Sequence, residues 1–208
     1  MTILILPDIF GHTPALDHLA DRVKGYIANQ PGQTAAKGAD TGSPLAVEIL
    51  DPYNGKISFR REDKAYRHFT SHMDIPAYSR LALDRLAAMD GPVFVLGFSV
   101  GAAALWHLSG QTDLPPVAGA MGFYGSRIRD HADIRPQFDI HLVFPETEPH
   151  FDVDLLMSEL KKTPKVSCEK APGGHGFMNA YSNNYSPDLY HRFTAVDIPE
   201  RYARSRAE

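Results

Sequence analysis

The sequence is short of the features that mark secreted and membrane-spanning proteins. It has one cysteine, Cys168, in 208 residues, so no internal disulfide can form. So little cysteine is typical of proteins from a reducing compartment. No apolar run approaches the length of a membrane span, and the apolar start at residues 1–7 lacks the charged segment of a signal peptide. We therefore expect a cytoplasmic protein without a membrane partner.

The sequence also has little net charge and no internal repeat. Its 21 Lys and Arg residues against 25 Asp and Glu residues give a net charge of -4. A nucleic-acid-binding domain is usually basic, so we expect no nucleic-acid partner. With 43% hydrophobic residues, a chain of this length can bury one sizeable core. We predict a single domain over residues 1–208, and composition leaves its oligomeric state open.

The most informative pattern is a serine between two glycines. An apolar, β-favouring run at 92–96 leads into Gly-x-Ser-x-Gly at 97–101, and an alanine-rich run follows. Strand, tight turn and helix are the context of a nucleophile elbow. Gly97 and Gly101 have no Cβ, so the chain can turn sharply and still pack closely. We predict that Ser99 lies at the carboxyl end of a strand in a strained conformation; the alternative is a tight turn with an incidental serine.

Strand and helix patterns alternate along the chain. Strands are expected at 2–6, 45–50, 92–96, 117–124, 140–144 and 165–169, and helices after Pro14, from Pro76, over 152–162 and from Pro187. A charged stretch at 58–74 predicts a solvated helix or an irregular connection, and 32–43 predicts a loop. The alternation indicates an α/β fold, with a mainly parallel sheet of about six strands and helices on both faces. Ligands bind such sheets at the carboxyl ends of the strands.

One histidine is well placed to act on Ser99. A serine hydroxyl is a poor nucleophile until a base takes its proton. His175 stands among Gly173, Gly174 and Gly176, and such a loop can project its ring toward the same sheet edge. The alternative is a loop histidine held by the backbone alone.

A second histidine pair has the spacing of metal ligands on a helix. His68 and His72 are four residues apart. The stretch lacks a partnering motif and is highly charged, so a solvated helix face is the better interpretation. We expect no metal and no cofactor.

The imidazole needs a carboxylate to fix its tautomer and to stabilise its charged form. Glu148 follows the fifth expected strand, where this fold supplies that group, and it is our prediction. Glu146 and Asp152 are close enough to compete. For Asp152 we prefer the role of a helix N-cap.

Four segments together resemble the dienelactone hydrolase branch of the α/β-hydrolases. They are Leu6-Pro7-Asp8-Ile9-Phe10-Gly11, Gly97-Phe98-Ser99-Val100-Gly101, Phe144-Pro145-Glu146-Thr147-Glu148-Pro149-His150 and Gly174-His175-Gly176-Phe177. They stand in the order nucleophile, acid, base, which is the order of that superfamily. The resemblance implies an α/β-hydrolase fold, here without the leading antiparallel strands, and a triad of Ser99, His175 and Glu148.

The resemblance also implies how an oxyanion would be held. In this fold one donor is the backbone N–H after the nucleophile, here that of Val100. The matching position in the first loop is Ile9, which would supply the second N–H. Asp8 matches an acidic residue that lies near the nucleophile in the family. It could tune Ser99, or it could simply hydrogen-bond the loop backbone.

The sequence departs from the family at three points. Ser99 stands where the named dienelactone hydrolases carry cysteine, Glu148 stands where they usually carry aspartate, and no arginine follows His175 within 176–180. The last point removes the support for a dienelactone substrate. Three arginines after the fourth expected strand could bind an anionic substrate, although charged loops are usually only solvated: Arg127, Arg129 and Arg135.

These features predict a serine hydrolase that cleaves an ester, thioester or lactone of a small molecule through an acyl-enzyme. The identity of the substrate and the acyl acceptor, water or another group, stay open. The alternative is a non-catalytic domain of the same fold that binds a small molecule or a protein.

Overall fold

The computed structural model describes all residues except 30–44, 54, 56 and 207–208. The loop expected at 32–43 lies outside the described residues. No helix among those described is long and apolar enough to cross a membrane.

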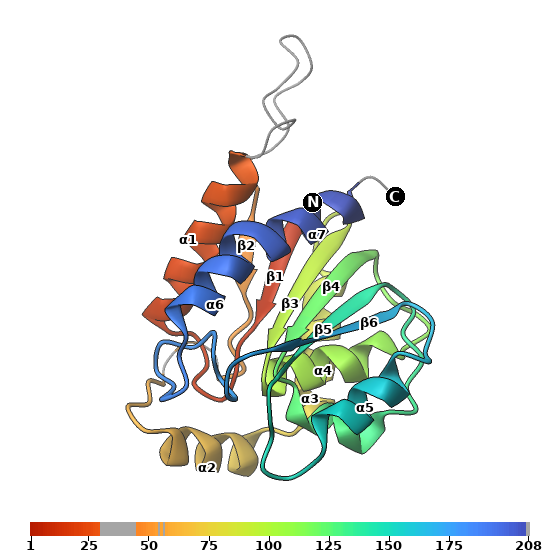
Figure 1. Ribbon diagram of the computed structural model, residues 1–208. Coiled ribbons are helices and arrows are strands. Elements are labelled where there is room, and N and C mark those ends of the chain that lie inside the picture. Colours follow the sequence, from red (N-terminus) through yellow and green to blue (C-terminus); the bar gives the residue numbers. More distant parts are fainter. Residues whose placement is uncertain (30–44, 54, 56, 207–208) are drawn as a thin grey trace.

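A six-stranded parallel sheet forms the centre of the molecule (Figure 1). Its strands are β1 (Thr2–Leu6), β2 (Val47–Ile49), β3 (Val93–Phe98), β4 (Val117–Phe123), β5 (Ile140–Pro145) and β6 (Val166–Ala171). The order across the sheet is β2-β1-β3-β4-β5-β6, and every neighbouring pair runs parallel. The predicted fold class is confirmed, and β3 continues two residues past its expected end.

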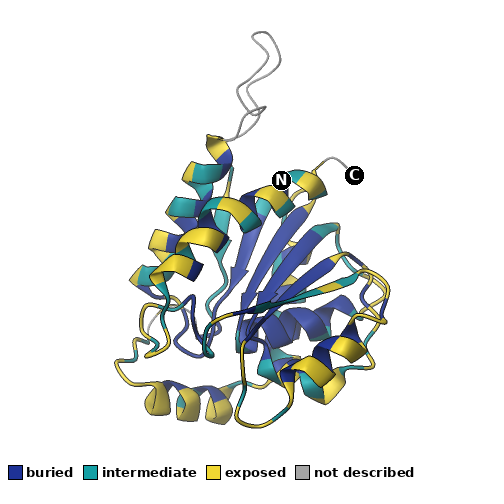
Figure 2. Cartoon of the chain, viewed as in Figure 1, coloured by how far each residue is buried: buried dark blue, intermediate teal, exposed yellow. Residues whose placement is uncertain are grey.

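Helices cover both faces of the sheet, because both faces of the central strands are apolar. One face packs against α3 (Ile75–Ala87), α4 (Val100–Ser109) and α5 (Val153–Leu160). The other packs against α1 (Pro14–Ala28), α6 (Pro187–Arg192) and α7 (Ile198–Ser205), with a π-helical turn at Phe193–Asp197. Figure 2 shows the central strands buried and the helices exposed on their outer sides.

The stretch predicted as a solvated helix or an irregular connection is helix α2 (Glu62–His72), which lies across the carboxyl ends of the strands (Figure 1). Only two of its residues, Ala65 and Phe69, are buried. The next helix, α3, begins where the Asp74 side chain accepts a hydrogen bond from the Ala77 N–H at 2.7 Å. The chain therefore passes the carboxyl ends of the strands in α2 before α3 packs against the sheet.

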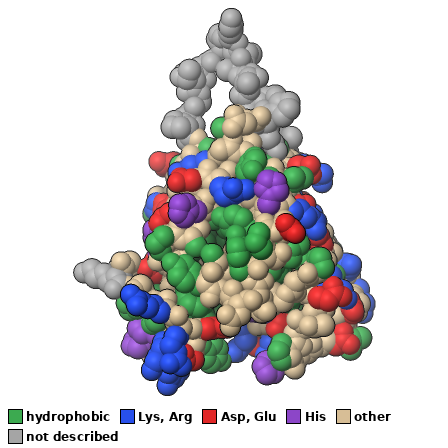
Figure 3. Space-filling view, turned by 60° about the vertical axis from the view of Figure 1, so that its left-hand side comes forward, with side chains coloured by type: hydrophobic (Ala, Val, Ile, Leu, Met, Phe, Trp, Pro, Cys, Tyr) green, Lys and Arg blue, Asp and Glu red, His purple; other side chains and the backbone are tan. Residues whose placement is uncertain are grey.

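The last described helix lies at the opposite end of the sheet. Met1 and α7 lie near the amino ends of the strands, and α7 packs there against β4 (Figure 1). Between α7 and the first residues of β5 and β6 lies an open cavity. On the face drawn in Figure 3, acidic, basic and histidine side chains are interspersed, and hydrophobic side chains gather near its middle.

Candidate active site

Ser99 occupies the sharp turn between β3 and α4. Its φ of 51° and ψ of -111° are rare for a residue with a side chain. The Ser99 N–H donates to the Phe123 carbonyl oxygen at 2.9 Å, which ties the turn to the next strand. The predicted strained conformation is present, and strain of this kind marks functional sites when surrounding contacts hold it.

The two glycines of the elbow are required by close packing. A Cβ on Gly97 would lie 2.7 Å from the Ala102 Cα. A Cβ on Gly101 would lie 2.1 Å from the Leu6 carbonyl oxygen and 2.5 Å from that of Pro7. The start of α4 is therefore pressed directly against the end of β1.

The three side chains expected to meet form one hydrogen-bonded chain. The Ser99 Oγ and the His175 Nε2 are 2.9 Å apart. The His175 Nδ1 lies 2.7 Å from the Glu148 Oε1. The side chain of Glu148 is 5% exposed and that of His175 is 32% exposed, so the carboxylate is shielded while the imidazole reaches the surface. This arrangement can pass a proton from the hydroxyl to the imidazole and stabilise the imidazolium that results.

The loop after β6 holds the imidazole from its backbone side. Gly176 has a φ of +87°, a conformation that favours glycine. The His175 carbonyl oxygen accepts hydrogen bonds from the Asn184 Nδ2 at 2.9 Å and the Ser182 Oγ at 3.3 Å. The Tyr124 ring packs on the His175 ring with 5.1 Å between centroids. The glycine signal predicted the loop, but nothing in the sequence indicated its two hydrogen-bond donors.

The competing carboxylates lie elsewhere. The Asp152 side chain accepts a hydrogen bond from the Leu155 N–H at 3.0 Å and caps α5, so the N-cap prediction is confirmed. Glu146 is exposed, and its carboxylate lies 3.8 Å from the Lys170 Nζ. Its backbone N–H donates to the Gly173 carbonyl oxygen at 2.9 Å, which joins the loop after β5 to the histidine loop.

The two backbone groups predicted to hold an oxyanion line the same cavity as Ser99. Ile9 and Val100 are both nearly buried there. Among the described residues, neither N–H donates a hydrogen bond to another group of the chain. The Tyr53 hydroxyl donates to the Ile9 carbonyl oxygen at 2.8 Å and holds the loop after β1 in place. Both N–H groups are therefore free to donate hydrogen bonds to a developing oxyanion.

Asp8 joins the loop after β1 to the histidine loop. Its Oδ1 accepts a hydrogen bond from the Phe10 N–H at 3.0 Å, and its Oδ2 accepts one from the Asn179 Nδ2 at 2.6 Å. Burial raises the pKa of Asp8 to about 6, and the two hydrogen bonds and His175 limit the rise. Within the described residues Asp8 has no hydrogen bond to Ser99, so the backbone-bonding interpretation fits its contacts. Sequence reasoning missed Asn179, because an isolated asparagine carries no spacing signal.

A cavity of about 720 Å³ opens above Ser99. One wall comes from α2 and the segment after it, and includes Tyr66, Phe69 and Met73. The opposite wall includes Arg127 and Arg129, whose side chains pair with Asp130 at 2.6 and 3.6 Å. Arg135 does not line this cavity. The charged pattern of α2 predicts a solvated helix and does not show which of its side chains line the site.

The remaining candidates stay apart from this chemistry. The rings of His68 and His72 are stacked with 4.2 Å between centroids, and the His72 Nδ1 hydrogen-bonds the His68 carbonyl oxygen. In the part of the chain that the structure describes, no three His, Cys, Asp or Glu side chains are grouped to hold a metal ion. Burial raises the pKa of the Cys168 thiol to about 11, which makes it a weak nucleophile.

Comparison with known proteins shows a relative by sequence. The uncharacterized protein YczH of Bacillus subtilis (strain 168) is 34% identical over 152 residues, which are 72% of this chain and 73% of that protein. No family model matches the sequence.

Comparison with solved structures identifies the fold. A cold-adapted esterase from an Arctic intertidal metagenomic library superimposes with a TM-score of 0.61 at 12% identity, over 98% of this chain and 82% of its own. A dienelactone hydrolase-like promiscuous phosphotriesterase from metagenomic libraries gives 0.59 at 16% identity, over 98% and 85%. The resemblance to dienelactone hydrolase-like α/β-hydrolases is confirmed at the level of the fold.

Proposed function

Because the chain belongs to the family of the Bacillus subtilis protein YczH and has the α/β-hydrolase fold, we propose that it is a serine hydrolase. Its substrate is an ester, thioester or lactone of a small molecule. One observation carries the proposal: the hydrogen-bonded chain from the Ser99 Oγ through His175 to the Glu148 carboxylate, at 2.9 and 2.7 Å. It lies at the strand ends where α/β folds bind ligands, beside a cavity of about 720 Å³.

In the first half of the reaction the Ser99 Oγ attacks the carbonyl carbon as its proton moves to the His175 Nε2. The carbonyl oxygen becomes an oxyanion, held by the N–H groups of Ile9 and Val100. The bond to the leaving group then breaks, and His175 gives that group its proton. The product is an acyl ester on Ser99.

In the second half a water molecule takes the place of the leaving group. His175 accepts a proton from the water, whose oxygen attacks the acyl carbon, and the bond to the Ser99 Oγ breaks as the proton returns to it. Glu148 holds the imidazole throughout with its Nδ1–H toward the carboxylate. Each oxyanion donor is worth on the order of 3 kcal/mol of transition-state stabilisation.

The test is covalent labelling of Ser99 together with turnover of short-chain p-nitrophenyl esters. The protein should react with a fluorophosphonate probe at Ser99 and hydrolyse the esters. Ser99→Ala should lose the label and reduce kcat by about 10⁵-fold or more. Ser109→Ala is the matched control, because Ser109 is a buried serine at the far end of α4 and its hydroxyl donates a hydrogen bond to the Trp106 carbonyl oxygen.

The result that contradicts the proposal is a folded protein that neither reacts with the probe nor turns over any ester, thioester or lactone tried. The non-catalytic binding domain would then be the better account. A protein that labels but hydrolyses slowly, and works faster when an alcohol or amine is added, would keep the triad and change the acyl acceptor.

A further inference from the structure

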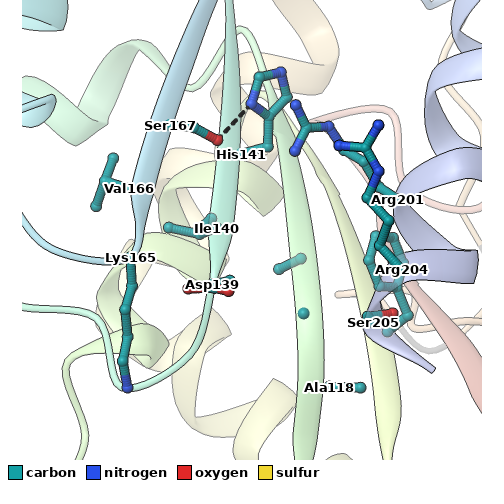
Figure 4. A pocket seen from close by; sticks show the side chains of 13 residues that line it. Ala118, Asp139, Ile140, His141, Lys165, Val166, Ser167, Arg201, Arg204 and Ser205 are labelled. Atoms are coloured by element: carbon teal, nitrogen blue, oxygen red, sulfur yellow. Dashed lines mark hydrogen bonds between the residues drawn. The ribbon is translucent and has the colours of Figure 1, made fainter. Parts of the chain in front are cut away.

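A second cavity, of about 360 Å³, lies at the opposite end of the sheet from Ser99. It is bordered by the first residues of β4, β5 and β6 on one side and by α7 on the other (Figure 4). Its floor is apolar and includes Phe94, Ala120 and Ile140. Its charged lining consists of one acidic side chain, Asp139, and three basic ones: Lys165, Arg201 and Arg204.

Two guanidinium groups enter this cavity from α7. Arg201 and Arg204 are three residues apart, so their side chains leave the helix on one side. Arg201 is half-buried and, among the described residues, makes neither a hydrogen bond nor an ion pair. Burial and the nearby charge of Arg204 lower the pKa of Arg201. Arg204 has a carboxylate oxygen of Glu200 no closer than 3.7 Å.

Nearby carboxylates of Glu169, Asp197 and Glu200 favour the charged form of Arg201, but among the described residues none of them forms an ion pair with it. The first two pair with Arg192 instead. Glu169 accepts a hydrogen bond from Arg192, and the Asp197 Oδ2 lies 3.0 Å from the Arg192 Nε. Asp139 lines the other side of the cavity, at the start of β5 and away from the two guanidinium groups (Figure 4). Arg201 therefore faces the cavity without a directly bonded acid, and Arg204 has only the 3.7 Å ion pair with Glu200.

Two further polar side chains, His141 and Ser167, line the cavity beside the pair, and a Glu169 carboxylate oxygen lies 3.5 Å from the His141 Nε2. The His141 Nδ1 and the Ser167 Oγ are hydrogen-bonded at 2.8 Å (Figure 4). Burial and the charges of Arg201 and Arg192 lower the pKa of His141 to about 3, so its imidazole carries no charge near neutral pH. The end of the cavity next to α7 thus offers two cations, a neutral imidazole and an apolar floor, while Lys165 and Asp139 lie on the opposite side.

We propose that this cavity binds a small organic anion through phosphoryl or carboxylate oxygens held between Arg201 and Arg204. Two like charges three residues apart on one helix repel each other, and an oxyanion held between them offsets that repulsion. The planar fork of each guanidinium matches the paired oxygens of a carboxylate or phosphate. The site is separate from the serine chemistry, so it does not depend on the proposed function.

The experiment is calorimetric titration of the whole protein with inorganic phosphate and, in a second arm, with succinate. Both are run at low ionic strength against sodium chloride of matched ionic strength, because screening weakens exposed charges. We expect saturable binding in at least one arm, and the arm that binds distinguishes a phosphoryl from a carboxylate ligand. Arg201→Gln and Arg204→Gln should each weaken binding by about tenfold or more.

Arg80→Gln is the matched control, because Arg80 is an exposed arginine on α3, on the other face of the sheet. It should bind as the wild type does. A second readout is the imidazole resonance of His141, whose pKa should rise when the anion arrives beside it. The proposal is wrong if neither anion binds saturably, or if the α7 variants bind as tightly as Arg80→Gln.

Discussion

The two ends of the sheet carry polar clusters of opposite kinds. At the carboxyl ends, Ser99, His175 and Glu148 satisfy one another, and the loops that carry them are joined by further hydrogen bonds. At the amino ends, Arg201 and Arg204 share a cavity with no described acid bound to Arg201.

The difference shows how each cluster would respond to change. A set of groups that are one another's partners loses function when any member is altered, since each holds the next in place. A charged side chain without a directly bonded partner, such as Arg201, contributes little to the free energy of unfolding, so its removal should cost the folded protein little.

The largest effect is expected at the carboxylate of the serine site. Glu148→Gln should lower kcat roughly 10³- to 10⁴-fold toward p-nitrophenyl esters, because the amide favours the wrong histidine tautomer. Asp152→Asn is the matched control and should leave kcat unchanged, since an asparagine still caps α5. If Asp152→Asn abolishes turnover and Glu148→Gln spares it, the assignment of the acid is wrong.

The next effect concerns Asp8 and the pH dependence of stability. Its pKa in the folded protein is about 6, against 3.8 as the ordinary value, so between these pH values the folded state binds more protons than the unfolded state. Stability from this group is therefore complete below about pH 4 and lost as the pH rises through about 6. The change is on the order of 3 kcal/mol in the free energy of unfolding.

Asp8→Asn should remove that part of the pH dependence, and urea unfolding at several pH values between 4 and 7 measures it. Asp84→Asn, an exposed position on α3, is the matched control. Identical pH profiles for the wild type and Asp8→Asn would show that Asp8 does not titrate in this range.

The smallest effect is expected at the amino-end cavity. In a buffer free of phosphate and carboxylates, Arg201→Gln should change the free energy of unfolding by no more than about 0.5 kcal/mol, and toward greater stability, because it relieves repulsion from Arg204. Arg192→Gln is the contrast: it should destabilise by up to about 1 kcal/mol, since it leaves Glu169 and Asp197 without their cation. A larger loss from Arg201→Gln would mean that the chain itself supplies its partner.

The fold and the three side chains of the serine site could be predicted from the sequence, because each has a local sequence pattern. The elbow glycines, the glycines around His175 and the apolar strand runs are short patterns with one structural meaning. The contacts that bring those segments together also follow from the rule that parallel strands end at one edge. The catalytic roles stay predictions until the labelling experiment is done.

What the sequence did not reveal depends on contacts between distant segments. Asn179 meets Asp8 across 171 residues, and Asn184 supports His175 only through the fold of its loop. The charge of the cavity beside α7 depends on which acids pair with Arg192, and no periodic pattern in the sequence predicts those ion pairs. Which side chains become hydrogen-bond or ion-pair partners depends on how distant segments pack together, and a pattern of neighbouring residues does not contain that information.

The contact between Gly101 and the end of β1 bears on how this protein could be redesigned. A Cβ on Gly101 would lie only 2.1 Å from the Leu6 carbonyl oxygen, so that position accepts no other residue unless the backbone moves. This close packing fixes the backbone N–H groups of Ile9 and Val100 relative to each other. Mutant libraries aimed at new substrates should hold 97–101 constant and vary the outer wall instead. Tyr66, Thr70 and Met73 border the large cavity from outside the sheet, where many side chains can be exchanged without disturbing the backbone around the nucleophile.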